Sequence, residues 1–162
     1  MIIVIQYRKE RADDGRIYIR SEEDNVCPIC IGVLVVVGVR DRMVTDSSGV
    51  IETLVIRRLR CKNCNKIHHE LPDMIIPYKR HCAETIENII VGEVAEVCCD
   101  FVTEHRVRTW WTAFSFYFEG LKTSLRMKYE VVFSSVPTPR EIVRAVVNMN
   151  LWIHTRTAMT PI

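Results

Sequence analysis

The sequence predicts an α+β fold in which an N-terminal β ribbon is followed by a helical bundle. Three observations predict this class: two Cys-x2-Cys pairs flank a stretch with strand character, the apolar spacing becomes helical after residue 80, and capping signals precede two later segments. We expect three parts. Residues 1–25 form a strand or hairpin with a polar loop, residues 26–80 a four-cysteine ribbon, and residues 81–162 a helical domain.

The first half of the chain carries strand signals. Residues 1–7 are rich in β-branched and aromatic side chains, and residues 17–19 indicate the second strand of a hairpin. Residues 33–40 form a nearly continuous Val/Leu run, and residues 51–60 resume strand character after a turn signal at 46–49. The two cysteine pairs therefore flank a predicted β-hairpin.

After residue 80 the apolar side chains recur every three or four positions. A helix of about ten residues is expected from His81 to Gly92. Asp100 is a suitable N-cap for a longer helix, and Thr138 with Pro139 starts a last helix through a capping box and a proline in the first turn. The apolar stripe of the long helix is expected to pack on the last helix; it contains Val107, Trp110, Trp111, Phe114, Phe118, Leu121 and Leu125.

The composition excludes several function classes. With 162 residues, 48% apolar and 26% charged, the chain is a folded protein too short for a large multidomain enzyme. No apolar run reaches the roughly 18 residues of a membrane span, and the first residues lack the basic front of a signal peptide, so we expect a cytoplasmic protein without a membrane partner. Because phosphate-binding glycine loops, nucleophile elbows and H-E-x-x-H helices are absent, we expect no enzymatic activity.

The two cysteine pairs predict a metal site. Cys27 with Cys30 and Cys61 with Cys64 supply four thiolates, and the predicted hairpin returns the second pair to the first. Seven cysteines in a reducing compartment favour metal binding over disulfides. A closed shell of four thiolates leaves no position for water. We therefore expect one structural Zn²⁺, with iron as the less favoured alternative.

The remaining cysteines and the neighbouring histidines are not expected to bind the ion. His68 and His69 are interpreted as residues that support a ligand or lie at the surface, because four thiolates already complete the shell. No second metal site is expected from Cys82, Cys98 and Cys99, whose roles the sequence leaves open.

Positive charge is concentrated around the second cysteine pair. Residues 27–80 hold nine Lys and Arg against five Asp and Glu, which is an electrostatic footprint for phosphate. Strand alternation predicts that Arg58 and Arg60 project together, whereas Arg57 lies on the apolar side. Phosphate contacts are expected from Arg58, Arg60, Lys62, Lys66, Lys79 and Arg80, and base-edge contacts from the exposed helix face at His105, Arg106, Arg108 and Thr109.

Several segments resemble a known family. The string RRLRCKNCNKIHHELPD at residues 57–73 and PYKR at 77–80 resemble an uncharacterised bacterial family of short zinc-ribbon proteins associated with transposable elements. The Trp110-Trp111 pair, TPREIVR at 138–144 and NLW at 150–152 extend the similarity over roughly residues 26–158. Ile31 and Asn65 stand where such knuckles usually have glycine, and residues 97–101 lack the small polar residues usual at the turn.

More distantly, the order of ribbon and helix-turn-helix is similar to the N-terminal part of insertion-sequence transposases, which implies DNA as the partner. We therefore expect a zinc-stabilised, transposase-associated DNA-binding protein. The alternative is an adaptor that docks on a recombinase or another protein through the ribbon and the Trp-rich helix. Burial of Trp110, Trp111 and Phe114 would weaken the adaptor hypothesis. RNA in place of DNA and the oligomeric state stay open.

Overall fold

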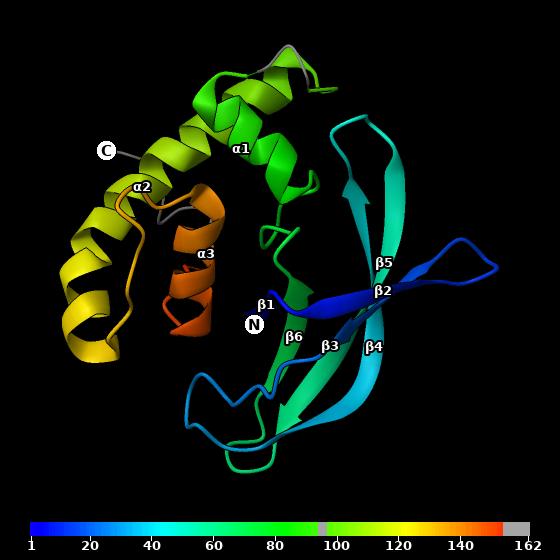
Figure 1. The fold of residues 1–162 in the computed structure, drawn as a ribbon, viewed down its shortest axis with the longest axis vertical. Helices are drawn as coiled ribbons and strands as arrows, with labels where there is room; N and C mark the ends of the chain where they lie inside the picture. Colours follow the sequence, from blue (N-terminus) through cyan, green and yellow to red (C-terminus); the bar gives the residue numbers. More distant parts are fainter. Residues whose placement is uncertain (94–96, 154–162) are drawn as a thin grey trace.

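The computed structural model describes residues 1–93 and 97–153 and shows a six-stranded sheet followed by three helices (Figure 1). The strands are β1 Ile2–Val4, β2 Tyr7–Arg11, β3 Ile17–Ser21, β4 Leu34–Thr45, β5 Ile51–Cys61 and β6 Ile67–Pro72. The helices are α1 Ala83–Val91, α2 Phe101–Tyr129 and α3 Pro139–Asn148. The α+β class and the order of strands before helices are thus confirmed.

The predicted hairpin is the longest pairing in the sheet. β4 and β5 run antiparallel from Thr45 opposite Ile51 to Leu34 opposite Cys61. Asp46 closes the turn, because its carboxylate accepts a hydrogen bond from the Val50 N–H at 2.8 Å. The sheet order is β1-β6-β5-β3-β2, with β4 on the other side of β5. The hairpin therefore carries both cysteine pairs at one end of the molecule.

Two features of the sheet differ from the sequence-based expectation. Residues 1–7 do not form one strand: β1 pairs in parallel with β6, and β2 begins at Tyr7 and pairs with β3. The strand β6 was not expected, because it contains the polar residues His68 and Glu70. Both side chains are buried in spite of their polarity, since each has a polar partner inside the fold.

The starts of α2 and α3 and the end of α1 lie where the sequence signals predict. The Asp100 carboxylate accepts a hydrogen bond from the Thr103 N–H at 2.6 Å, and the Thr138 hydroxyl accepts one from the Glu141 N–H at 3.2 Å. Gly92 ends α1 with a φ of 100°. The connector from α1 to α2 covers residues 92–100, which exceeds the turn of about three or four residues in a helix-turn-helix. The helix-turn-helix stays a prediction.

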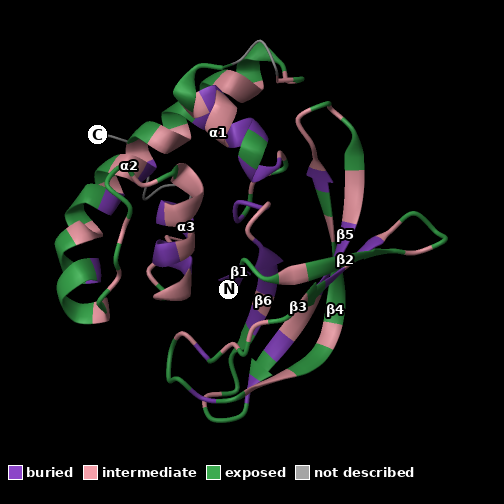
Figure 2. Cartoon of the chain, in the orientation of Figure 1, coloured by how far each residue is buried: buried purple, intermediate pink, exposed green. Residues whose placement is uncertain are grey.

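One hydrophobic core joins the helices to one face of the sheet. Phe114 and Phe118 of α2 pack in the same cluster as Val146 of α3 and Ile56 of β5, so the expected packing of the long helix on the last helix is confirmed. Figure 2 shows the buried positions along β5, β6 and the inner sides of the helices. The cluster contains residues from all three segments expected from the sequence. Within the described part of the chain, no helix has the length and hydrophobicity needed to cross a bilayer.

Candidate metal centre and basic groove

The four cysteines of the two pairs meet at one end of the β4–β5 hairpin. Their Sγ atoms all lie within 4.8 Å of one another. The Sγ atoms of Cys27 and Cys64 are 3.6 Å apart, and those of Cys30 and Cys61 are 3.4 Å apart. Sulfur atoms bound tetrahedrally at about 2.3 Å from an ion lie about 3.8 Å from one another. The cluster could therefore hold a metal ion.

The two cysteine pairs adopt the same backbone turn. The Ile31 N–H donates to the Cys27 carbonyl at 2.8 Å, and the Asn65 N–H donates to the Cys61 carbonyl at 3.1 Å. Ile31 and Asn65 have φ values of 59° and 58°, so they take the left-handed conformation usual for glycine. A β-branched side chain loses roughly 1–2 kcal/mol there. Such a conformation persists only where the surroundings fix it, and the sulfur cluster is the feature that both turns share.

Backbone amides next to the Cys61 sulfur favour its thiolate form. The amides of Cys64 and Asn63 donate hydrogen bonds toward the buried Cys61 sulfur and lower the pKa of this thiol to about 6. Cysteine binds metal as the thiolate, so these amides favour the metal-binding form of Cys61. His68 is buried beside the cluster, with its Nε2 atom 3.4 Å from the Cys27 sulfur. Burial lowers the pKa of His68 to about 4, which keeps its ring neutral next to the sulfur atoms.

Gly32 lets the two turns approach each other. A Cβ atom at this position would lie 2.8 Å from Asn63 Cγ and 2.9 Å from the Cys61 sulfur. We expect Gly32→Ala to lower zinc affinity about 10- to 100-fold, because the second pair must shift away from the first. Competition against a chromophoric chelator measures this change. Gly120→Ala is the control, because its Cβ would meet nothing within 4 Å, and equal losses in the two variants would contradict the expectation.

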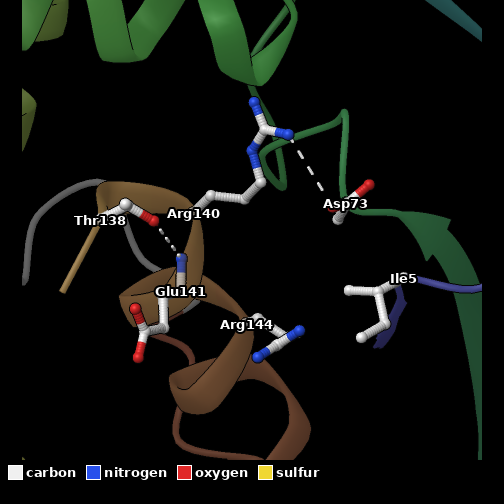
Figure 3. A pocket seen from close by; sticks show the side chains of 6 residues that line it. All are labelled: Ile5, Asp73, Thr138, Arg140, Glu141 and Arg144. Carbon is white, nitrogen blue, oxygen red and sulfur yellow. Dashed lines mark hydrogen bonds and ion pairs between the residues drawn. The ribbon is translucent and has the colours of Figure 1, made fainter. Parts of the chain in front are cut away.

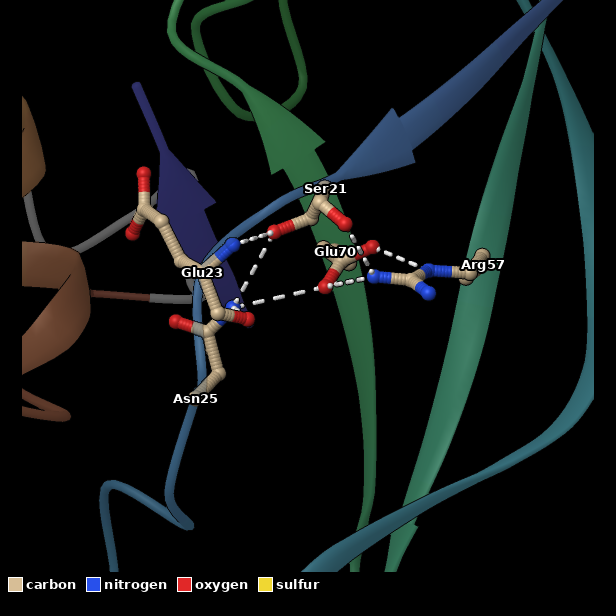
Figure 4. A network of polar contacts seen from close by, with 5 residues as sticks. All are labelled: Ser21, Glu23, Asn25, Arg57 and Glu70. Carbon is tan, nitrogen blue, oxygen red and sulfur yellow. Dashed lines mark hydrogen bonds and ion pairs between the residues drawn. The ribbon is translucent and has the colours of Figure 1, made fainter. Parts of the chain in front are cut away.

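A largely buried ion pair joins β5 to β6 (Figure 4). Arg57 on β5 donates from Nε and from a terminal nitrogen to the two carboxylate oxygens of Glu70 on β6, at 2.6 and 2.9 Å. The Asn25 amide donates to the same carboxylate at 3.4 Å. Arg57 is thus turned inward, as strand alternation predicts, and it is neutralised by a carboxylate that the sequence analysis did not select.

The face of β5 opposite Arg57 carries Arg58 and Arg60, which project together with arginines of β4. Arg58 faces Gly38, and the next positions along the ladder place Arg40 opposite Ile56 and Arg42 opposite Leu54. Arg40 and Arg42 therefore share the face of Arg58 and Arg60. Sequence analysis missed this pair, although the turn at 46–50 already implies the register. Arg60, Lys62 and Lys66 are exposed toward the cysteine end.

A groove of about 1020 Å³ brings together two regions that the sequence singled out separately. One wall is the segment 78–81, and the other is the first half of α2. Among the described residues that line it, none is acidic: they are Thr45, Tyr78, Lys79, Arg80, His81, Ile86, Thr103, His105, Arg106, Val107, Thr109 and Trp110. A hollow of about 110 Å³ adjoins it through Tyr78 and is lined by Arg40, Arg42 and His69, among others.

The arginines of the β4–β5 face and the groove differ from those of the β2–β3 hairpin in how their charges are matched. Within the described part of the chain, Arg40, Arg58, Arg80 and Arg106 form no ion pair, whereas the β2–β3 hairpin pairs its arginines with carboxylates: Arg8 with Glu22, Arg11 with Glu52, Arg16 with Asp14 and Arg20 with Glu10. Burial, followed by the charges of Arg40 and Arg58, lowers the pKa of His69. The arginines without an ion pair named above therefore lie on the β4–β5 face and in the groove.

Two of the predicted contact residues have partners elsewhere in the protein. The Lys79 ammonium lies 4.0 Å from the centroid of the Trp110 ring, and burial lowers the pKa of Lys79 to about 8. Arg108 pairs with Glu104 at 3.0 Å and does not line the groove. The groove thus unites Arg80, His105, Arg106 and Thr109, and it leaves Arg108 outside.

A separate hollow at the start of α3 holds paired charges (Figure 3). It has a volume of about 190 Å³. Arg140 donates to Glu87 on α1 at 2.9 Å and lies 3.8 Å from Asp73, which also accepts a hydrogen bond from Tyr7. These contacts tie α3 to α1 and to the end of β6. We assign this hollow a structural role.

The family of the chain is shown by comparison with known proteins. The model of the domain of unknown function DUF6431 matches residues 27–110, which is just over half of the chain. The chain belongs to this family. The DUF6431 match begins at the first cysteine of the metal cluster and ends at Trp110, so it contains both cysteine pairs and the residues that line the groove. No curated protein and no solved structure matches the chain.

Proposed function

We propose that this protein is a zinc-stabilised, non-catalytic DNA-binding protein. The observation that carries the proposal is the basic groove, in which Arg80 and Arg106 face a common space without an acidic neighbour in the described lining. Unneutralised arginines in a concave surface attract phosphate, which supplies most of the affinity in nucleic-acid binding. The resemblance to zinc-ribbon proteins of transposable elements supports a mobile-element setting.

Zinc is the ion that suits the cysteine cluster best. Four thiolates at tetrahedral spacing form a closed shell, which is the donor set of structural zinc sites. Such an ion contributes folding free energy and joins the first turn to the end of β5. Its proposed role is to hold the hairpin that carries Arg58 and Arg60.

The walls of the groove divide the proposed contacts into two kinds. Arg80, together with Arg40 and Arg58 on the neighbouring sheet face, offers charge to phosphates and carries no sequence information. His105, Arg106 and Thr109 project from the first turns of α2 and offer donors and acceptors to base edges. This division does not require the helix-turn-helix geometry, because the arginine of the second wall, Arg80, comes from segment 78–81, whereas α1 contributes the apolar Ile86 to the lining.

The test is a salt titration of binding to random duplex DNA by the zinc-loaded protein. We expect the logarithm of the affinity to fall linearly with the logarithm of the salt concentration. Arg80→Glu combined with Arg106→Glu should weaken binding at every salt concentration and reduce the slope by about two.

Lys9→Glu combined with Arg126→Glu is the matched control, because it changes the net charge equally at exposed positions outside the groove. If the two double variants weaken DNA binding equally, the affinity depends only on the net charge of the protein. The groove assignment would then be wrong.

A protein-interaction adaptor is the second candidate, and a different surface favours it. Phe114 is buried, and Trp110 and Trp111 pack on the core, so the Trp-rich helix is a poor anchor. Instead, Ile31 and Val33 beside the first cysteine pair are exposed, as are Val36 and Val39 of β4. Among the described strands β4 pairs only with β5, and its one further bridge joins Thr45 to His81 at the far end, so the edge at Val36 and Val39 could accept a partner strand. Replacing Val36 and Val39 by Lys would abolish such pairing and leave DNA binding intact.

A further inference from the structure

Tyr78 combines an unusual backbone with an exposed ring. Its φ is 63°, in the left-handed region that favours glycine, and 64% of its surface is exposed. The Lys79 N–H donates to the Ile76 carbonyl at 3.1 Å, so Pro77 and Tyr78 are the central residues of a tight turn. A positive φ at the second central position is the type II pattern, where glycine or asparagine is usual. The chain instead presents a large aromatic ring to solvent at a site of strain, which is typical of functional positions.

The segment that carries Tyr78 is fixed on both sides. Arg42 donates to the Lys79 carbonyl at 2.5 Å, and the Thr45 N–H donates to the Arg80 carbonyl at 2.8 Å. The Lys79 ammonium covers the face of Trp110 on α2. The turn is thereby tied to β4 and to α2 at once. The backbone that carries the Tyr78 ring is consequently held in place, which lowers the conformational entropy lost on binding.

Tyr78 lies where two basic concavities meet. It lines the hollow that contains Arg40, Arg42 and His69, and it also lines the groove that contains Arg80 and Arg106. The described residues that line the two concavities include no Asp or Glu. A second ring stands at the far wall, where His105 stacks on the exposed Phe101 with centroids 6.5 Å apart. Positive charge therefore continues on both sides of an exposed aromatic ring.

This arrangement differs from what a duplex requires. Bases in a duplex are stacked on one another, so an aromatic side chain has no base face to contact without disrupting the helix. A single strand exposes base faces, and proteins that bind it combine a basic groove along the backbone with aromatic rings on which bases stack.

We propose that this basic track binds single-stranded nucleic acid, with an unpaired base stacked on Tyr78 and the flanking phosphates held by Arg40 and Arg42 on one side and by Arg80 and Arg106 on the other. The inference rests on the proposed function and specifies its substrate class. The strained turn exposes the ring to solvent. The nucleic-acid strand on each side of the stacked base would lie in one of the two concavities.

The experiment compares a labelled oligodeoxythymidine of about 12 nucleotides with a duplex of the same length, by fluorescence anisotropy on the zinc-loaded protein. We expect the single strand to bind more tightly. Tyr78→Ala should weaken single-strand binding about 10- to 100-fold and change duplex binding less than about twofold, whereas Tyr78→Phe should keep the wild-type affinity. An oligouridine of equal length shows whether the single strand preferred is DNA or RNA, through the 2′-hydroxyl.

Tyr78→Gly separates stacking from folding, because glycine takes a positive φ without strain and should leave the melting temperature equal or higher. The same loss of single-strand binding in this variant supports the proposal. Equal binding of single strand and duplex, unchanged in Tyr78→Gly, would overturn the single-strand inference while the DNA-binding function stands. Absence of binding to every oligonucleotide would overturn the proposed function together with the inference.

Discussion

Cys61→Ser is expected to abolish the proposed zinc binding and to unfold the cysteine end of the β4–β5 hairpin. Cys61 is buried, its thiol has a pKa of about 6, and it belongs to a cluster with no further cysteine nearby to replace it among the described residues. Structural zinc sites bind with about 10–16 kcal/mol, which is as large as the roughly 5–15 kcal/mol stability of an ordinary domain. Elemental analysis of zinc per chain and thermal melting by circular dichroism measure the two effects.

Cys98→Ser is the matched control for this variant. Cys98 is exposed and lies outside the cluster, so its replacement should leave one zinc per chain and an unchanged melting temperature. Removal of the metal from the wild-type protein by a chelator should cause the same loss of structure as Cys61→Ser. A fully folded, metal-free Cys61→Ser protein would show that the four cysteines are not a structural metal site.

Glu70→Ala is expected to destabilise the protein by about 3–5 kcal/mol, because it leaves the Arg57 guanidinium inside the fold without its carboxylate. The Glu70 side chain is 1% exposed and that of Arg57 is 22% exposed, so water screens the pair only slightly. The pair joins β5 to β6, and Asn25 joins the segment before Cys27 to the same carboxylate. Urea denaturation measures the change in the free energy of unfolding.

Two further variants test whether the uncompensated charge of Arg57 causes the expected loss of stability in Glu70→Ala. Glu10→Ala removes the partner of Arg20 in an exposed pair, where the loss should stay within about 1 kcal/mol. Combining Glu70→Ala with Arg57→Leu should recover part of the stability, since the uncompensated charge is then absent. If Glu70→Ala costs no more than Glu10→Ala, the network does not hold the strands together.

The parts of the fold that sequence analysis predicted correctly depend on short stretches of chain. The Cys-x2-Cys spacing forms a chelating turn whatever its surroundings, so Cys27, Cys30, Cys61 and Cys64 could be grouped in advance. Helix starts are equally local, because Asp100 bonds an N–H three residues away. The hairpin followed from one turn signal between two apolar runs. Even the inward direction of Arg57 was implied by the alternation of a single strand.

The parts that sequence analysis missed depend on distant segments. The strand β6 contains polar residues that are buried only because Arg57 and Cys27 meet them from other elements. Arg40 became part of the basic surface through its register with β5. Lys79 was expected at the surface, but Trp110 from α2 lies beneath its ammonium.

By itself, the sequence determined the α+β class, the four-cysteine cluster, the starts of α2 and α3, the end of α1 and the excess of positive charge near the second pair. Only the tertiary structure decided which of these charges act together. The packing of α2 against segment 78–81 forms the groove, aligns Arg80 with Arg106 and exposes the ring of Tyr78 between two basic concavities. The physical reason is that covalent spacing and backbone capping act within a few residues. A binding surface is instead built by side chains that approach one another only after the core has formed.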